Sequence, residues 1–304
     1  MPTRCPACGR APVRDLGPAA EVPGAIALAD PGHIHECHAC GLLFRRPYPD
    51  ARQLAAAYAA MPPDHWAGGP GRRDFALARR AIRRLCLAGD VLDVGCFRGD
   101  FLAGLPPRYR RFGIEPSAPA ARIASDRGVL ILGRTLEEAS IAGPTFDVIT
   151  LFDVIEHLPN PAEALARVAS WLRPGGAVIV ATGNTESLLW RWARRDYWYC
   201  FPEHVSFCSQ RWFQWAAGRV GLTVCSAVRF SYHPPSLYRL ARQLAGFLTF
   251  RAMRQAAACP WLYRPLARLY PFSRAARWPA TPPTTAWPDH ILVVLRSPQP
   301  PGTA

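Results

Sequence analysis

A strand that runs into a glycine turn, within residues 91–102, constrains the fold of this chain more than any other feature. Residues 91–94 predict a buried strand, with Asp93 near its end. Gly95 and Gly99 then allow a tight turn into a helix, where the backbone can approach a ligand closely. Such a turn predicts a ligand site at the carboxyl end of a sheet.

Glu115 ends a second predicted strand, residues 111–115, and lies 20 residues beyond Gly95. A carboxylate at that distance can accept hydrogen bonds from ribose hydroxyl groups. A nicotinamide or flavin dinucleotide is the competing ligand. The turn reads G-x-x-x-G, however, where a dinucleotide site has G-x-G-x-x-G. The charge of Asp93 would repel a pyrophosphate but suits a cationic sulfonium with a free amino group, so the sequence favours a sulfonium ligand.

Five segments extend this pattern along the chain in order: residues 92–96 with Gly99, 113–117, 146–149, 154–158 and 172–176. In these segments the chain resembles class I S-adenosylmethionine-dependent methyltransferases, and the resemblance covers roughly residues 74–296. It implies that Asp93, Gly95 and Gly99 line the methionine part of S-adenosylmethionine. It also implies that Glu115 holds the ribose.

The same resemblance implies the rest of the cofactor site. Thr135 and Leu136, after the third strand, would border the adenine, and Phe152 and Asp153 would face the cofactor from the fourth. The full expected set of cofactor contacts is Asp93, Gly95, Cys96, Gly99, Glu115, Pro116, Thr135, Leu136, Phe152 and Asp153.

Strands and helices alternate through most of the chain, which predicts an α/β fold with a doubly wound, mostly parallel seven-stranded sheet of the Rossmann-like methyltransferase type. Pro161 is a favourable first residue for one of the expected helices, and Ser209 is a favourable cap for another. The expected helices are 74–87, 161–172 and 210–219. The expected strands are 90–95, 111–115, 129–132, 146–152, 177–182, 222–230 and 290–296.

Two Cys-x-x-Cys pairs near the start of the chain predict a metal site. Cys5, Cys8, Cys37 and Cys40 supply four soft ligands on two knuckles, a pattern typical of a closed, structural Zn²⁺ site in a small ribbon. A redox pair is the alternative, but it would need one knuckle and not two. Such a short module buries little apolar surface, so we expect the metal to supply much of its folding energy.

These patterns divide the chain into a zinc-ribbon-like module (1–47), a helical linker (48–73), the methyltransferase domain (74–230 with 290–298) and an insertion (231–289). Within the linker, a short helical piece over 47–61 places Leu54 and Tyr58 on one face. The insertion is rich in Arg and aromatic residues. It fits a helical cover on the catalytic domain, or, through residues 238–278, a peripheral contact with an anionic membrane surface.

Candidate catalytic residues lie in two places. The resemblance extends to sugar C-methyltransferases with a zinc-binding N-terminus, in which a Glu-His pair takes part in acid/base chemistry. It implies that His157 is the base and that Glu156 orients it or holds a substrate hydroxyl, although His157 could simply pack. The second place is an aromatic loop, residues 197–206, where Tyr199, Glu203 and His204 could line a pocket for a small organic acceptor.

The formal charge of +14 does not by itself indicate nucleic acid, because every basic residue is Arg and the composition suggests a coding bias. The segment after the fourth strand also lacks the Pro-Pro-aromatic motif of enzymes that grip a flipped base, so a nucleic-acid partner is not favoured. We expect a cytoplasmic enzyme acting on a sugar, secondary-metabolite or envelope intermediate. The alternatives are an RNA or protein methyltransferase that docks through the zinc module, and a non-catalytic cofactor-binding scaffold. The oligomeric state is not predicted.

Overall fold

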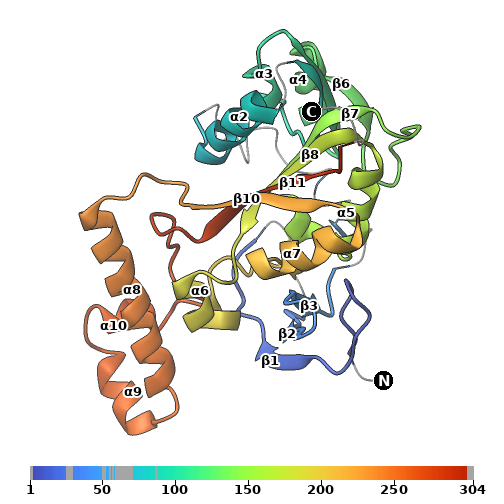
Figure 1. Ribbon diagram of the computed structural model, residues 1–304. Coiled ribbons are helices and arrows are strands. Elements are labelled where there is room, and N and C mark those ends of the chain that lie inside the picture. The colour runs from blue at the N-terminus through green and yellow to red at the C-terminus, as the bar shows by residue number, and fades with distance from the viewer. Residues whose placement is uncertain are drawn as a thin grey trace.

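The structure is a computed structural model that describes residues 3–24, 30–49, 53–54, 56, 58, 71–85 and 88–299. A seven-stranded sheet of order β10-β11-β8-β7-β4-β5-β6 forms its centre (Figure 1). Pairing is parallel from β6 to β8, whereas β11 is antiparallel to both β8 and β10. The strands are β4 (Gly89–Val94), β5 (Tyr109–Ile114), β6 (Leu130–Gly133), β7 (Phe146–Phe152), β8 (Leu172–Gly183), β10 (Thr223–Phe230) and β11 (His290–Arg296). The predicted fold class is confirmed.

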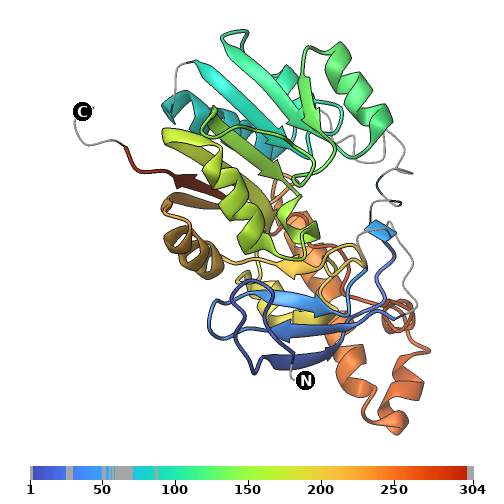
Figure 2. The same cartoon turned by 90° about the vertical axis from the view of Figure 1, so that its right-hand side faces the viewer.

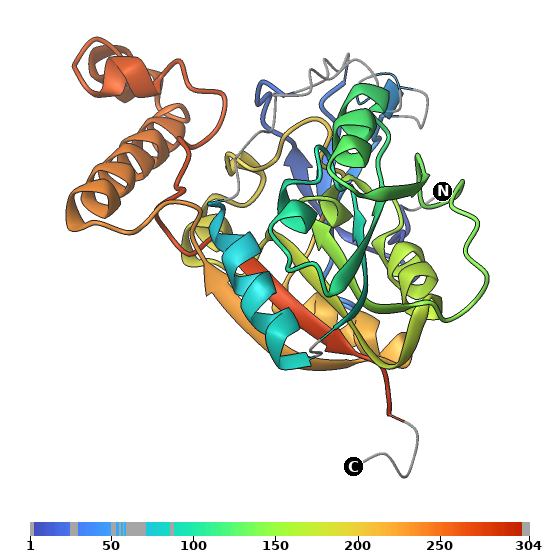
Figure 3. The ribbon, with the colours of Figure 1, turned by 90° about the horizontal axis from the view of Figure 1, so that it is seen from above.

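Helices cover both faces of this sheet, because buried residues alternate between its sides. On one side Phe75, Ala78 and Ile82 of α2 share a core with Val91 and Val148. On the other side lie α5 and α7, and Figure 3 shows the sheet between these layers. The helices are α2 (Arg73–Leu85), α3 (Asp100–Ala103), α4 (Ala118–Asp126), α5 (Pro161–Ser170), α6 (Leu188–Ala193) and α7 (Gln210–Arg219), with short 3-10 turns at Ile155–His157 and Arg194–Asp196.

Capping residues mark the starts of two of the predicted helices, and the structure shows their hydrogen bonds. Asn160 accepts a hydrogen bond from the Glu163 N–H at the start of α5, and Ser209 accepts one from Trp212 at the start of α7. The helix expected over 161–172 ends at Ser170. It stops there because β8 begins earlier than the expected strand 177–182, with Leu172 already paired to Phe146.

A second, four-stranded sheet joins the N-terminal segment to the part of the chain that carries the central sheet (Figure 2). Its strands are β1 (Arg14–Pro18), β2 (His33–Glu36), β3 (Leu43–Arg46) and β9 (Ser206–Phe207). The last strand comes from the end of the aromatic loop and pairs with β3. Cys37, Cys40 and Phe44 share one buried core with Trp212 and Phe213. The N-terminal segment therefore packs as one body with the central α/β fold, which the sequence did not predict.

The linker is described only in part. Leu54 and Tyr58 are helical, as expected of the piece over 47–61. Of the other residues in that piece, only 47–49, Gln53 and Ala56 are described. Residues 62–70, Cys86 and Leu87 also lie outside the described residues.

The insertion between β10 and β11 forms three helices, α8 (Leu237–Ala256), α9 (Pro260–Leu266) and α10 (Phe272–Ala275). One face of α8 buries Phe247 and Phe250, and the Phe247 ring lies 5.3 Å from that of Trp192. Helices α9 and α10 lie away from the central sheet (Figure 1). The insertion packs on the rest of the chain around the middle of α8 and again through the segment after α10, where Trp198 N–H donates to the Thr281 hydroxyl. Among the described helices, none has the length and apolar character needed to cross a membrane.

Candidate functional site

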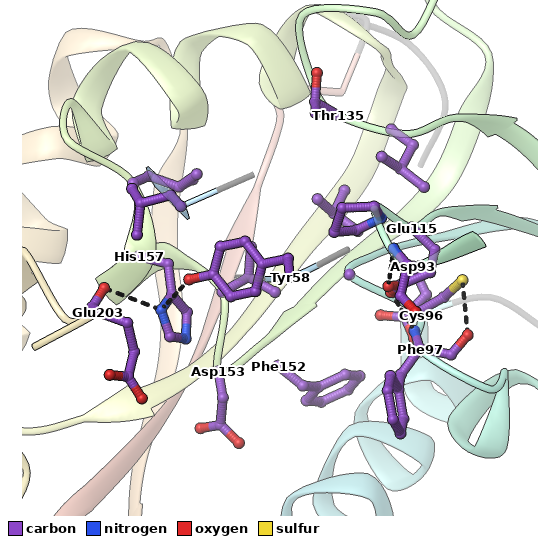
Figure 4. A pocket seen from close by; sticks show the side chains of 18 of the residues that line it. Tyr58, Asp93, Cys96, Phe97, Glu115, Thr135, Phe152, Asp153, His157 and Glu203 are labelled. Atoms are coloured by element: carbon purple, nitrogen blue, oxygen red, sulfur yellow. Dashed lines mark hydrogen bonds between the residues drawn. The ribbon is translucent and has the colours of Figure 1, made fainter. Parts of the chain in front are cut away.

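A cavity of about 1130 Å³ lies at the carboxyl ends of β4, β5 and β7. Parallel α/β sheets bind ligands at this edge. In Figure 4, Asp93, Glu115 and Cys96 lie toward one end of the cavity, and His157 and Glu203 lie toward the other. The volume slightly exceeds the ~300–1,000 Å³ usual for one ligand. The cavity can therefore hold a cofactor and a second small molecule together.

Asp93 is the second-last residue of β4, and its carboxyl group is buried in the cavity wall. The Thr150 hydroxyl donates to Asp93 Oδ1 over 2.6 Å and fixes its orientation. Burial raises the pKa of Asp93 to about 7. A cation placed beside this group would restore its charge. Gly95 follows at φ +71°, and a Cβ there would stand 2.5 Å from a methyl carbon of Val154, so the turn requires glycine.

Glu115 follows β5 and lies buried opposite the glycine turn. Its two carboxylate oxygens accept backbone hydrogen bonds, one from Phe97 N–H at 2.8 Å and one from Ser117 N–H at 2.8 Å. Burial raises the pKa of Glu115 above its usual value. Each oxygen keeps a further lone pair, so the group can still accept hydrogen bonds from a ligand diol.

Gly99 has a different place from the one predicted. It lies at the start of α3 with φ +72° and is not among the residues that line the cavity. A Cβ at this position would stand 3.1 Å from Val129 and 3.3 Å from Ala124. Its role is to let α3 and α4 pack closely. Cys96 does line the cavity, in space left by Gly113, where a Cβ would meet the Cys96 sulfur at 2.5 Å.

The remaining expected cofactor residues all lie in the cavity wall. Pro116 follows Glu115, and Thr135 and Leu136 come from the loop after β6. Phe152 ends β7, and its ring lies 5.0 Å from Phe75. The wall therefore combines apolar surface with acids that converge from separate strands, which is the usual make-up of a ligand site.

Asp153 follows Phe152 and is held by two groups that the sequence analysis did not include. Arg72 donates to its carboxylate at 2.6 Å, and the Tyr232 hydroxyl donates at 2.6 Å. Burial alone would raise the pKa of Asp153, but Arg72, His290 and the Tyr232 hydroxyl together hold that pKa below its usual value. Asp153 has φ +53°, which is rare for a residue with a side chain. The site thus keeps a fixed negative charge between its two ends.

Glu156 lies behind the cavity wall and not in it. One oxygen accepts the Tyr199 hydroxyl, and the other accepts the Thr182 hydroxyl at 2.9 Å. Burial raises the pKa of Glu156 to about 7. Both oxygens already have partners within the protein. The carboxyl group therefore ties the aromatic loop to the end of β8.

His157 and His204 face each other at the other end of the cavity, with ring centres 4.7 Å apart. Nδ1 of His157 lies 2.7 Å from the Tyr58 hydroxyl and 3.2 Å from the Glu203 carbonyl oxygen. Nδ1 of His204 lies 2.8 Å from the Tyr199 carbonyl oxygen. Because a carbonyl oxygen only accepts, we assign the proton of each ring to Nδ1. A neutral ring then carries its lone pair on Nε2.

Burial lowers the pKa of both histidines, that of His204 well below its usual value. Both rings are therefore neutral near pH 7 and able to accept a proton. Glu156, His157 and His204 also bring one potential ligand atom each within 4.8 Å of the others. Glu156 already has a hydroxyl partner on each of its two oxygens.

The aromatic loop is held in place by the N-terminal segment. Arg45 of β3 is almost fully buried, and it donates to the carbonyl oxygens of Cys200 at 2.9 Å, Phe201 at 3.0 Å and His204 at 3.2 Å. Pairing of β3 with β9 fixes the end of the same loop. The position of His204 therefore depends on the fold of the N-terminal segment.

The four N-terminal cysteines converge with their sulfur atoms within 4.8 Å of one another. Cys5 and Cys40 are 3.6 Å apart, and Cys8 and Cys37 are 3.5 Å apart. A disulfide would bring sulfurs to about 2.05 Å. A tetrahedral zinc with bonds of about 2.3 Å spaces its sulfurs by roughly 3.8 Å. The donor set and spacing fit such an ion.

Several residues that build the site carried little signal in the sequence. Tyr58 was expected only as part of an apolar helix face, and nothing distinguished Arg72 or Arg45 from other arginines. Tyr232 comes two residues after β10, at the cavity end of that strand, which was the one available clue. These side chains reach the site from distant segments, so only the fold brings them together.

Comparisons with known proteins agree with this fold and cavity. A family model described as a methyltransferase domain matches residues 70–227. A ubiquinone biosynthesis O-methyltransferase of Sodalis glossinidius is 33% identical over 129 residues, which cover 40% of this chain and 51% of that protein. One from Burkholderia multivorans is 36% identical over 110 residues, which cover 32% of this chain and 46% of that protein. The chain thus spans about half the length of the curated relatives it matches.

Two solved structures resemble the fold. The [4+2]-cyclase SpnF superposes with a TM-score of 0.53 at 17% identity, covering 83% of this chain and 98% of that one. A chain from the complex of the Haloferax volcanii Trm112 methyltransferase activator with a methyltransferase gives 0.52 at 16% identity, covering 81% and 98%. At such identities the likeness is evidence for the fold alone.

Proposed function

Because this chain belongs to the methyltransferase-domain family, we propose that it transfers a methyl group from S-adenosylmethionine to a hydroxyl oxygen of a small organic acceptor. The observation that carries the proposal is that one cavity is lined by Asp93 and Glu115 at one end and by His157 and His204 at the other. Curated relatives are named as O-methyltransferases, which supports oxygen as the atom methylated.

The acidic end of the cavity suits S-adenosylmethionine. When bound, the cofactor supplies a methyl group already activated by a sulfonium charge. Asp93 would meet the positively charged methionine part, and Glu115 would accept from the ribose hydroxyls. Thr135 and Leu136 would border the adenine. Acids at this end disfavour the pyrophosphate of a dinucleotide, because like charges repel.

At the other end, His157 is placed to act as general base. The Glu203 carbonyl oxygen, on the Nδ1 side of the ring, favours a proton there and leaves the Nε2 lone pair for the acceptor. As the new bond to oxygen forms, the hydroxyl proton would pass to Nε2, and Tyr58 would hold the ring from behind. Glu156 acts as a positioning residue through Tyr199, and His204 would contact the acceptor beside His157.

The zinc site belongs to the same proposal. Cys5, Cys8, Cys37 and Cys40 would hold Zn²⁺ with four thiolates and no open position, so its role is structural. By ordering the N-terminal segment, the ion would fix Arg45 and thereby the aromatic loop. The acceptor site would then depend on zinc, although none of its lining residues is a zinc ligand.

The affinity for S-adenosylmethionine is expected to fall as the pH drops below about 7. Protonation of Asp93, whose pKa burial raises to about 7, removes the charge that the cationic cofactor meets. Binding linked to one proton weakens by up to about tenfold per pH unit below that pKa and becomes constant well above it. Isothermal titration across this range measures the slope. Asp93→Asn is the matched control and should bind weakly at every pH, whereas an unchanged slope in this variant would assign the titration to another group.

Transfer itself can be tested without knowing the acceptor. The purified protein and S-adenosylmethionine with an isotope-labelled methyl group are added to small metabolites from a strain that lacks the gene. We expect the label in one low-molecular-weight product detected by mass spectrometry. Label in RNA, together with salt-sensitive RNA binding, would instead support a nucleic-acid substrate. Cofactor binding without transfer to any fraction would favour a non-catalytic scaffold.

A further inference from the structure

The part of the insertion farthest from the central sheet forms a tip that has no part in the proposed function. Residues 261–270, which contain most of α9 and the turn toward α10, form this tip. Phe247 of α8 anchors the insertion in an aromatic core with Trp190 and Tyr197. From there the helices extend away from the sheet, and Figures 1 and 2 both show α9 at the far end. The tip therefore lies apart from the cofactor and acceptor cavity.

Large apolar side chains are concentrated and exposed on this tip. Trp261 is 77% exposed, Tyr270 81%, Leu269 57% and Leu262 38%. Single exposed apolar residues are common on soluble proteins, but four such side chains within ten residues are not. Packing does not account for them, since α9 has no buried residue, and Leu269 and Tyr270, which lie beyond its end, are exposed. An apolar surface of this kind indicates a partner.

The charge around the tip is of one sign. Residues 231–288 contain no Asp or Glu, and all 22 acidic residues of the chain lie outside this segment. The run without acids begins earlier, directly after Glu203, and a coding bias toward Arg does not explain the absence of Asp and Glu over so long a stretch. Arg264 and Arg268 stand within the tip and are exposed. The arginines of the segment are Arg239, Arg242, Arg251, Arg254, Arg264, Arg268, Arg274 and Arg277.

The types of side chain on the tip distinguish between two anionic partners, nucleic acid and a lipid bilayer. Nucleic acid attracts Arg and stacks on aromatic rings, but exposed leucines gain nothing from a phosphate backbone. At a bilayer surface, Trp and Tyr lie at the headgroup level, Leu enters the acyl boundary and Arg contacts lipid phosphates. Leu262 and Leu269 beside Trp261 and Tyr270 therefore favour a lipid surface.

We infer that the tip binds the surface of an anionic phospholipid bilayer. Trp261, Leu269 and Tyr270 enter the boundary between headgroups and acyl chains, and Arg264 and Arg268 contact the phosphates. The attachment is peripheral, because α9 is far too short to span a bilayer. This inference stands without the proposed methyl transfer, and its test does not measure activity.

Vesicle flotation with the protein of residues 1–304 tests the inference. We expect the protein to float with vesicles of phosphatidylcholine mixed with phosphatidylglycerol and to stay in solution with phosphatidylcholine alone. Changing Trp261→Ser together with Tyr270→Ser should lower the partition coefficient by about tenfold or more. Changing Arg264→Gln together with Arg268→Gln should remove the preference for anionic vesicles. Leu188→Ser, at a 71% exposed leucine of α6, is the matched control and should bind as the wild type does.

Two results would overturn the inference. One is a wild-type protein that does not float with anionic vesicles at low salt. The other is vesicle binding that persists unchanged in the Trp261→Ser, Tyr270→Ser variant, particularly if the protein also binds RNA through the same arginines. Because the substituted side chains are exposed, every variant should keep the melting temperature of the wild type, which excludes unfolding as the cause of lost binding.

Discussion

Replacing His157 by glutamine is expected to lower kcat by about 10²- to 10⁴-fold while leaving the Kd for S-adenosylmethionine nearly unchanged. Glutamine keeps much of the size and polarity of the ring but has no lone pair that can take a proton near neutral pH. Loss of a positioned general base typically has an effect of this size. The cofactor end of the cavity is built by other residues, Asp93 and Glu115 among them, so binding should persist.

The dependence of kcat on pH gives a second test of the role of His157. Since burial lowers the pKa of His157, kcat of the wild type should rise with pH through a value below 6.5 and then level off. His233→Gln, at an exposed histidine outside the cavity, is the matched control and should keep full activity. If His157→Gln instead turned over within a few-fold of the wild type, the base would lie elsewhere, and His204 would be the next residue to replace.

Removing the metal from the N-terminal segment is expected to have the second large effect. Zinc binding contributes about 10–16 kcal/mol to the folding of small zinc modules, as much as the whole stability of many domains. Without the ion, we expect the N-terminal segment to lose its order, so that Arg45 on β3 no longer holds the aromatic loop. We therefore expect Cys37→Ser with Cys40→Ser to lower kcat/KM for the acceptor by about 10²-fold or more.

The matched measurements separate this effect from general unfolding. Affinity for S-adenosylmethionine should change by only about threefold, because Asp93 lies on β4 of the central sheet and Glu115 directly follows β5. Elemental analysis should find one zinc per chain in the wild type and none in the variant. Cys225→Ser, at an exposed cysteine outside the cluster, should behave as the wild type. A zinc-free variant with full acceptor turnover would refute the link from Arg45 to the acceptor site.

The central sheet could be predicted because its signals are local. Each strand is a short apolar run, and the glycine turn after Val94 must lie where backbone meets ligand. Asp93 lies near the end of β4 and Glu115 directly follows β5, so the convergence of the two acids follows from the parallel pairing of these strands. For these residues, position along the chain determines position in the fold.

The acceptor end could be predicted only in part, because distant segments assemble it. The two-residue strand β9 has no periodicity to detect, yet it joins the N-terminal segment to the aromatic loop. Glu156 was expected to orient His157 or to hold a substrate hydroxyl, and it lies behind the wall because the Tyr199 and Thr182 hydroxyls donate to its two oxygens. Gly99 was expected beside the cofactor and serves helix packing, because α4 approaches it from the other side.

The claim on which the account depends is that the acidic end of the cavity binds S-adenosylmethionine. Isothermal titration of the wild type against Asp93→Ala tests it most directly. The account predicts binding of one cofactor per chain by the wild type and an affinity at least about tenfold lower in the variant, measured near pH 8 where Asp93 is ionised. No binding by the wild type, or equal binding by both proteins, would contradict it.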